Sequence, residues 1–191
     1  ENEGRLNDIG RYIARDRMIQ HTSNRLQYVA DRKKYPEIAN EKIVKPVFII
    51  GMPRTGTTIL HDILGQDSAS RVPMTWECMF PSPPTQRATF GTDPRIAACE
   101  ATFPDIDQLI PGFKAMHPMG AQLSQECVSL MAETMCTPLF HNQFRIPSYQ
   151  DWVDRSDFSH VYEFHKRQLQ QFQWQCPGDR WVLKTGAHMW G

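Results

Sequence analysis

Residues 47–64 carry the strongest fold signal in the sequence. The apolar run VFII at 47–50 leads directly into the octapeptide GMPRTGTT at 51–58, and apolar residues at helical spacing follow. This order predicts a buried strand, a turn bounded by glycines and the start of a helix. Such a turn aims successive backbone N–H groups and the positive end of a helix at one point, which suits a phosphate or another tetrahedral dianion. An ordinary tight turn is the simpler alternative, but two glycines, three hydroxyls and an arginine favour an anion-binding loop.

The loop differs from that of nucleotide triphosphatases at one position. Their pattern is GxxxxGK[ST], in which the lysine reaches the β- and γ-phosphates and the last hydroxyl holds Mg²⁺. Here Thr57 stands at the lysine position, and the cation Arg54 lies inside the turn. The loop is therefore better suited to a smaller, metal-free anion. A P-loop nucleotide kinase or triphosphatase stays open as an alternative, although the lysine substitute and the magnesium-binding aspartate that it needs are not visible.

Three segments together resemble a known family. The phrase PVFIIGMPRTGTT at 46–58 resembles the 5'-phosphosulfate loop of sulfotransferases that use 3'-phosphoadenosine 5'-phosphosulfate (PAPS), in the bacterial-type branch with a GxPR[ST]GTT loop. PMTWE at 73–77 with PSPP at 81–84, and RWVLKT at 180–185, resemble later segments of that family. The resemblance implies transfer of a sulfonate from PAPS to an acceptor hydroxyl, without a metal. It also implies that the 5'-phosphosulfate is bound by Gly51, Pro53, Arg54, Thr55, Gly56, Thr57 and Thr58.

The resemblance implies catalytic roles as well. Arg54 and Lys184 would offset charge on the transferring group, as donors aimed at developing charge do. An alcohol is a poor nucleophile until its proton leaves, and Glu77 matches the glutamate that removes this proton in related enzymes. His117 is the second candidate, because cytosolic sulfotransferases use a histidine base. The simpler interpretations are a surface carboxylate for Glu77, a hydrogen-bonded loop histidine for His117 and a solvated strand-end lysine for Lys184.

Two further positions need comment. Gly186 departs from the family pattern, which usually has proline after the strand and its basic residue. Glu126 is the third acidic candidate, but it stands at the start of a predicted helix. A glutamate there can simply favour the positive end of the helix, and we expect that role for Glu126.

The chain is expected to form an α/β fold in which a parallel, P-loop-like sheet is flanked by helices, with the anion loop at the carboxyl end of its first strand. Residues 1–45 are predicted as an N-terminal helical region, because residues 6–34 hold apolar side chains at helical spacing and contain no proline. A helix or a pair of helices fits that stretch. Residues 46–191 are predicted as the α/β core, with further helices over 124–135 and 157–175.

Residues 73–118 are rich in proline and predict a long, mostly loop-like insertion. Such insertions in compact domains are often binding loops or lids. Its aromatic and methionine side chains either line an apolar acceptor pocket or form a small core under a loop; they are Trp76, Phe80, Phe90, Phe103, Phe113, Met116 and Met119.

Composition restricts the partners and the compartment. The 21 basic and 21 acidic residues balance, so the chain has no bulk attraction for nucleic acid. The five cysteines form no regular framework and suit buried thiols of a reducing compartment. We expect a cytoplasmic protein without an integral membrane segment, whose partner is a small-molecule, lipid or sugar acceptor with a hydroxyl. No HExxH or paired CxxC motif is present, so no metal site is expected.

The extent of the resemblance raises a further expectation. In the sulfotransferase family a later strand and loop, with an Arg-Asp-Pro step and a downstream serine, hold the 3'-phosphate of the donor, and neither follows Lys184. The resemblance thus implies an amino-terminal portion of the domain, truncated on its C-terminal side. Donor binding and activity of this chain by itself stay open. A non-catalytic relic that binds a nucleotide or a protein partner is therefore the second alternative.

Overall fold

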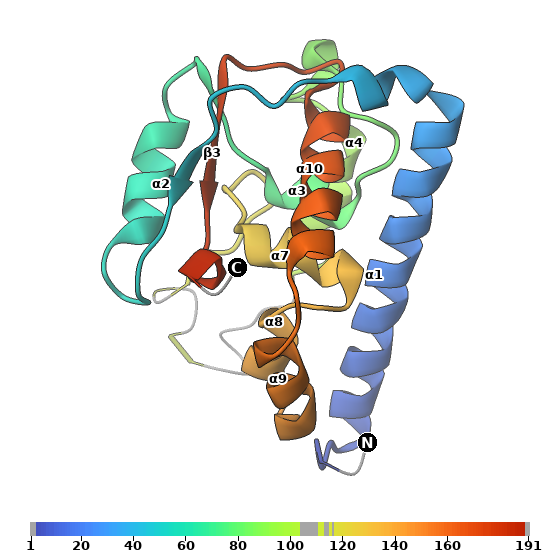
Figure 1. Cartoon of the computed structure of the whole chain (residues 1–191), viewed down its shortest axis with the longest axis vertical. Helices are drawn as coiled ribbons and strands as arrows, with labels where there is room; N and C mark the ends of the chain where they lie inside the picture. Colours follow the sequence, from blue (N-terminus) through green and yellow to red (C-terminus); the bar gives the residue numbers. More distant parts are fainter. Residues whose placement is uncertain (1–2, 104–110, 113–114, 116, 190–191) are drawn as a thin grey trace.

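The computed structural model describes residues 3–103, 111, 112, 115 and 117–189 (Figure 1). Its sheet consists of β1 (Val47–Ile49), β2 (Ser70–Arg71) and β3 (Arg180–Lys184) in the order β1-β3-β2. Both pairings are parallel, so the last strand of the chain lies between the first two. The predicted α/β class, with a small parallel sheet flanked by helices, is confirmed.

The two faces of β3 are covered by different helices. Val182 packs with Ile49 and Val72 near α2 (Thr57–Gly65), whereas Trp181 and Leu183 belong to the main core. This alternation follows from the two-residue repeat of a strand. Helix α2 thus lies on one side of the sheet, and the helices of the main core lie on the other (Figure 1).

Two long helices form the other side of the molecule. Helix α1 (Asp8–Lys34) is a single helix of 27 residues, where the sequence left one helix or two open, and α10 (Ser159–Gln173) runs beside it (Figure 1). The side chain of Asn7 accepts a hydrogen bond from the backbone N–H of Gly10 and caps the start of α1. The short 3₁₀ helix Pro36–Asn40 then turns the chain toward β1.

The insertion at residues 73–118 is more helical than predicted. It contains α3 (Thr75–Met79), the 3₁₀ helix Arg87–Thr89 and α4 (Pro94–Glu100). Its prolines lie mainly between these helices, and Pro94 occupies the first helical position, which tolerates proline. Four of the aromatic side chains predicted to line a pocket or form a small core pack around Cys99 and Ala121; they are Trp76, Phe80, Phe90 and Phe103. Phe113 and Met116 lie outside the described residues.

The remaining elements are short. They are α7 (Cys127–Met131), the 3₁₀ helix Ala132–Thr134, α8 (Leu139–Gln143), α9 (Pro147–Asp154) and the 3₁₀ helix Gly186–Met189. The helix predicted over 124–135 is thus limited to a single α-helical turn and a 3₁₀ turn. All five cysteines are buried free thiols.

Candidate functional site

The loop at 51–56 has the backbone of an anion-binding turn. Arg54 and Gly56 both take left-handed conformations, with φ of 66° and 86°. Alternating left- and right-handed residues turn successive N–H groups to one side, which forms a concave site for an anion. Thr55 braces the turn, because its hydroxyl donates to the backbone carbonyl of Met52 at 2.7 Å. Helix α2 begins at Thr57, directly after the turn.

Helix α2 is fixed to the sheet by a buried histidine. Nε2 of His61 lies 3.1 Å from the backbone oxygen of Val182. Burial lowers the pKa of His61, so the ring is neutral, and Nε2 must carry the hydrogen because the carbonyl can only accept. The contact ties the helix that begins at the loop to the strand that ends at Lys184.

A close approach of two backbones explains the glycine at position 186. A Cβ atom there would lie 3.2 Å from the backbone oxygen of Gly51. The turn after β3 therefore rests against the first residue of the loop. Gly51 is itself crowded, since a Cβ would lie 3.0 Å from Cγ2 of Thr57. Both glycines allow loop and strand end to pack tightly.

Lys184 brings a cation to the loop. It is the last residue of β3, in register with Ile49 of β1, and its side chain is only 7% exposed. Its Nζ donates to the hydroxyl of Thr58 at 3.0 Å and forms an ion pair with Oε1 of Glu126. The structure therefore brings together the predicted residues Lys184 and Thr58, and it adds Glu126.

Glu126 reaches this place through the segment that leads into α7. Ser124, two residues earlier, pairs with Met74 and donates through its hydroxyl to Asp62 of α2. Glu126 is the N-cap residue of α7, but among the described residues its side chain makes no capping hydrogen bond. Glu126 thus lies at the start of a helix, as expected, and its carboxylate also pairs with Lys184. The sequence offered Glu126 as a third acidic residue but held no signal for this contact, because it depends on how segments 58 residues apart pack.

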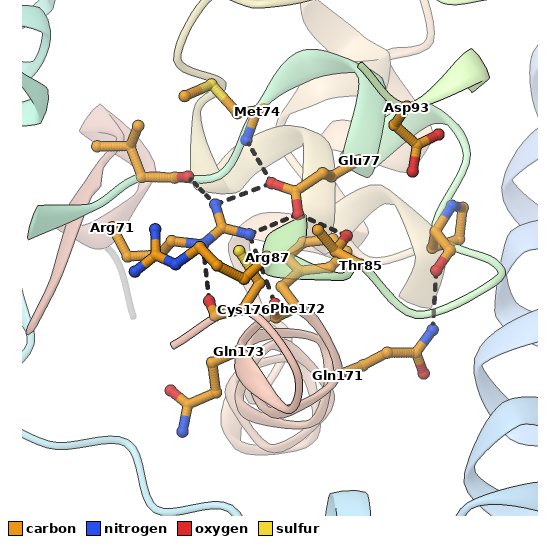
Figure 2. Close-up of polar contacts among 12 residues, drawn as sticks. Arg71, Met74, Glu77, Thr85, Arg87, Asp93, Gln171, Phe172, Gln173 and Cys176 are labelled. Atoms are coloured by element: carbon orange, nitrogen blue, oxygen red, sulfur yellow. Dashed lines mark hydrogen bonds and ion pairs between the residues drawn. The ribbon is translucent and has the colours of Figure 1, made fainter. Parts of the chain in front are cut away.

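Glu77 lies in a buried ion pair (Figure 2). Its carboxylate is 0% exposed and accepts from the guanidinium of Arg71 at 2.9 and 2.5 Å. The hydroxyl of Thr85 and the backbone N–H of Met74 add hydrogen bonds of 2.7 and 3.3 Å. Figure 2 shows both carboxylate oxygens turned toward these donors. The structure thus joins Glu77 to Arg71 and not to the residues of the loop.

The guanidinium of Arg71 is equally enclosed. It donates to backbone oxygens of Val72 and Cys176 and lies over the rings of Phe90 and Trp181 (Figure 2 draws the polar contacts). Burial lowers the pKa of Arg71, but the charge and hydrogen bonds of Glu77 outweigh it and leave the pKa above its usual value. The guanidinium engages both carboxylate oxygens of Glu77, and Thr85 and Met74 donate to the same two oxygens, so an acceptor hydroxyl finds them already occupied.

The two remaining predicted residues are exposed. Arg54 lies on the surface of the loop, where its side chain is accessible to an arriving anion. His117 is also exposed, in a segment flanked by residues outside the described ranges. In the described part of the chain, no group of three or more His, Cys, Asp or Glu side chains suits a metal ion. Of the helices described, none is long and apolar enough to cross a membrane.

The comparisons with known proteins all identify sulfotransferases. The model of the sulfotransferase family matches residues 46–189. The chain is 29% identical over 154 residues to proteins named omega-hydroxy-beta-dihydromenaquinone-9 sulfotransferase Stf3 from Mycobacterium bovis and Mycobacterium tuberculosis, a match that covers 75% of this chain and 36% of theirs.

Two solved structures are similar as well. Sulfotransferase STF1 of Mycobacterium tuberculosis superposes with a TM-score of 0.80 at 31% identity, over 96% of this chain and 49% of that one. Sulfotransferase STF9 of Mycobacterium avium superposes with a TM-score of 0.82 at 30% identity, over 95% of this chain and 47% of that one. The chain thus spans about a third of the length of the curated relatives and about half of the solved chains.

Proposed function

Because the chain belongs to the sulfotransferase family, we propose that it binds PAPS and serves transfer of its sulfonate to an acceptor hydroxyl. The observation that carries this proposal is the placement of Lys184 on the hydroxyl of Thr58, at the first turn of the helix that follows the loop. A phosphosulfate in the loop would meet the N–H groups of residues 54–58 and the hydroxyls of Thr57 and Thr58. Lys184 and Arg54 would then face the bond that breaks.

Electrostatic stabilisation is the main task in this reaction. When the sulfonate leaves the phosphate, negative charge grows on the phosphate oxygen, and cations held in place beforehand lower the barrier. Lys184 suits this role because its Nζ is held between fixed partners in a nearly closed environment. Arg54 supplies a second cation on the open side of the loop.

The acceptor is proposed to be a hydroxyl-bearing small molecule, lipid or sugar. The lipid alternative has support from the curated relatives, whose name describes a sulfotransferase of a hydroxylated menaquinone. The balanced charge of the chain gives no support to a nucleic-acid partner. The five buried free cysteines support a cytoplasmic location.

The base that takes the acceptor proton is a separate question. The sequence predicted Glu77 or His117, and Glu77 is enclosed by Arg71, Thr85 and Met74. We therefore do not carry Glu77 forward as the base. His117 stays a candidate through the family resemblance alone.

Turnover by this chain alone and turnover by the natural-length protein are two separate proposals. The relatives are about twice its length or more, and we infer that the parts of the donor beyond the 5'-phosphosulfate are held by residues that this chain does not contain. A chain that binds nucleotide without turnover is the second candidate function. Release of product by the natural-length protein would argue against it.

Calorimetric binding of 3'-phosphoadenosine 5'-phosphate tests the proposal, with magnesium-ADP as the control ligand, on this chain and on the natural-length protein. We expect a preference for the 3'-phosphorylated ligand. Arg54→Ala should weaken that binding about ten- to hundredfold, since a hydrogen bond to a charged group is worth about 1.5–3 kcal/mol. Preference for magnesium-ADP would instead support the kinase or triphosphatase alternative, and unchanged binding by Arg54→Ala would contradict the role of the loop.

A further inference from the structure

Among the described residues, the carboxylate of Glu126 is the one that contacts Lys184. Its side chain is 32% exposed, unlike the fully enclosed side chain of Glu77. Oε1 is engaged by Lys184, while Oε2 has no hydrogen-bond partner within the described part of the chain. One oxygen therefore fixes the carboxylate beside the site, and the other is left to act on a bound molecule.

We infer that Glu126 is the general base of the sulfonate transfer. The inference rests on the function proposed above and assigns to it a residue that the sequence expected only to stabilise a helix end. A base must lie within hydrogen-bond reach of the proton that it removes. The acceptor oxygen must approach sulfur from the side opposite the phosphate, and Lys184 sits between Glu126 and the loop hydroxyl of Thr58. With Oε1 held by Lys184, Oε2 is the oxygen of Glu126 that would meet the acceptor hydroxyl.

The reaction balances with this assignment. The acceptor O–H gives its proton to Oε2 of Glu126 while its oxygen forms a bond to sulfur. The bond between sulfur and the 5'-phosphate oxygen breaks, and its electron pair stays on the phosphate. The products are a sulfate ester and 3'-phosphoadenosine 5'-phosphate. Glu126 then releases its proton to water, to which it is partly exposed.

Donor binding should also prepare the base. In the free protein Nζ of Lys184 is shared between the carboxylate of Glu126 and the hydroxyl of Thr58. A bound phosphosulfate brings negative charge to the same lysine, so that Glu126 is then flanked by an anion and holds a proton more readily. Lys184 would in this way pass from the carboxylate to the donor, and the base would become stronger when the substrate is present.

The test uses Glu126→Gln in the natural-length protein, with two independent measurements. The first is calorimetric titration of PAPS at about pH 5.5, near the range where carboxylates titrate, in two buffers with different ionisation enthalpies. We expect proton uptake on binding by the wild type and a clear loss of that uptake in Glu126→Gln. The second is release of 3'-phosphoadenosine 5'-phosphate from PAPS with 1-octanol as the acceptor, where kcat should fall about 100-fold or more while the affinity for the desulfonated donor is retained.

Two variants separate the base from a structural role. Glu163→Gln removes a carboxylate that is paired with a cation on the exposed face of helix α10, and it should leave both measurements unchanged. Glu126→Asp keeps the acid and should recover part of the turnover. Equal proton uptake by wild type and Glu126→Gln, or wild-type turnover by Glu126→Gln, would overturn the inference. If the wild type binds neither PAPS nor its desulfonated form, the proposed function itself fails, and this assignment fails with it.

Discussion

Arg71 and Glu77 form an ion pair that is almost closed to water, with side chains 5% and 0% exposed. Each charge lost its hydration on folding and is compensated by the other charge and by fixed hydrogen bonds, and the rings of Phe90 and Trp181 add to this for Arg71. Glu77→Gln would leave the guanidinium buried without its counter-charge. We expect this variant to lose about 3–5 kcal/mol of unfolding free energy, the usual cost of breaking a buried pair. Urea unfolding followed by far-ultraviolet circular dichroism measures it.

The double variant Arg71→Met, Glu77→Leu is the control for that cost. It removes both charges together and replaces them with apolar groups, so it should be less destabilised than Glu77→Gln alone. A single variant that unfolds at the wild-type urea concentration would show that the pair contributes nothing to stability. If Glu77 acts only in stability, any loss of activity in Glu77→Gln should follow the loss of folded protein.

Glu77 and Glu126 show how far residue types in a sequence can predict a site. The sequence offered both glutamates as acidic candidates, and it favoured the catalytic role for Glu77 and a helix-end role for Glu126. The contacts that distinguish them lie in the packing: Arg71 turns back over α3 onto one carboxylate, and Lys184 reaches the other across 58 residues of chain. Nothing in the spacing of either glutamate contains this information.

The turn between β1 and α2 depends on a left-handed glycine. Gly56 has φ of 86°, and a Cβ atom there would meet none of the described atoms within 4 Å. The cost of Gly56→Ala is therefore a backbone cost of about 1–2 kcal/mol. Urea unfolding should show this loss. Gly91→Ala is a matched control, because a Cβ atom at Gly91 is equally free of close described neighbours and no positive φ is involved. Equal stability of the two variants would contradict the role assigned to the turn.

The strand-turn-helix around this glycine was the part of the fold that the sequence predicted best, because apolar period, glycine and helix start occur within one short segment. The insertion at 73–118 was predicted less well. Its prolines indicated loops, whereas α3 and α4 form between them and pack on a core that includes Cys99 and Ala121. Tertiary packing stabilises such short helices, and local sequence carries little of that information.

Strand β1 and helix α2 expose an apolar surface at one edge of the sheet. The sequence predicted a buried strand over 47–50, but only Ile49 is buried, because β1 is an edge strand with a single neighbour. The exposed apolar side chains of this surface are Val47, Phe48, Ile50, Ile59, Leu60 and Ile63. An edge strand beside exposed apolar side chains is a site of self-association.

The double variant Ile59→Lys, Ile63→Lys tests this on the 191-residue chain. The two positions are four apart and lie on one side of α2, so both charges enter the apolar surface. We expect less association at high protein concentration, measured by static light scattering. Leu26→Lys is the control, since Leu26 is an equally exposed apolar residue on α1. An equal effect of Leu26→Lys would show that added charge alone is responsible.

Acid should destabilise the whole fold through its buried histidines. Burial, with a smaller contribution from His188, lowers the pKa of His165 to about 3, and burial lowers the pKa of His188 to about 4. The rings lie with centroids 6.4 Å apart at the end of β3, between α10 and the last 3₁₀ helix. In the unfolded chain both take up a proton near pH 6.5. Between the folded and unfolded values the unfolded chain binds more protons, so stability is complete above about pH 6.5 and falls as the pH decreases below it.

Each such histidine contributes a slope of about 1.4 kcal/mol per pH unit in that window. His165→Leu removes one of them and a buried ring nitrogen, Nε2, that lacks a partner in the described residues. We expect this variant to match the wild type near neutral pH and to lose less stability between about pH 6 and pH 4.5. Urea unfolding at a series of pH values gives the two slopes. His160→Leu, an exposed histidine of the same helix, is the control. A neutral, buried His165 requires the two slopes of unfolding free energy against pH to differ. If His165→Leu and the wild type lost stability in parallel, the acid sensitivity would have to come from other groups.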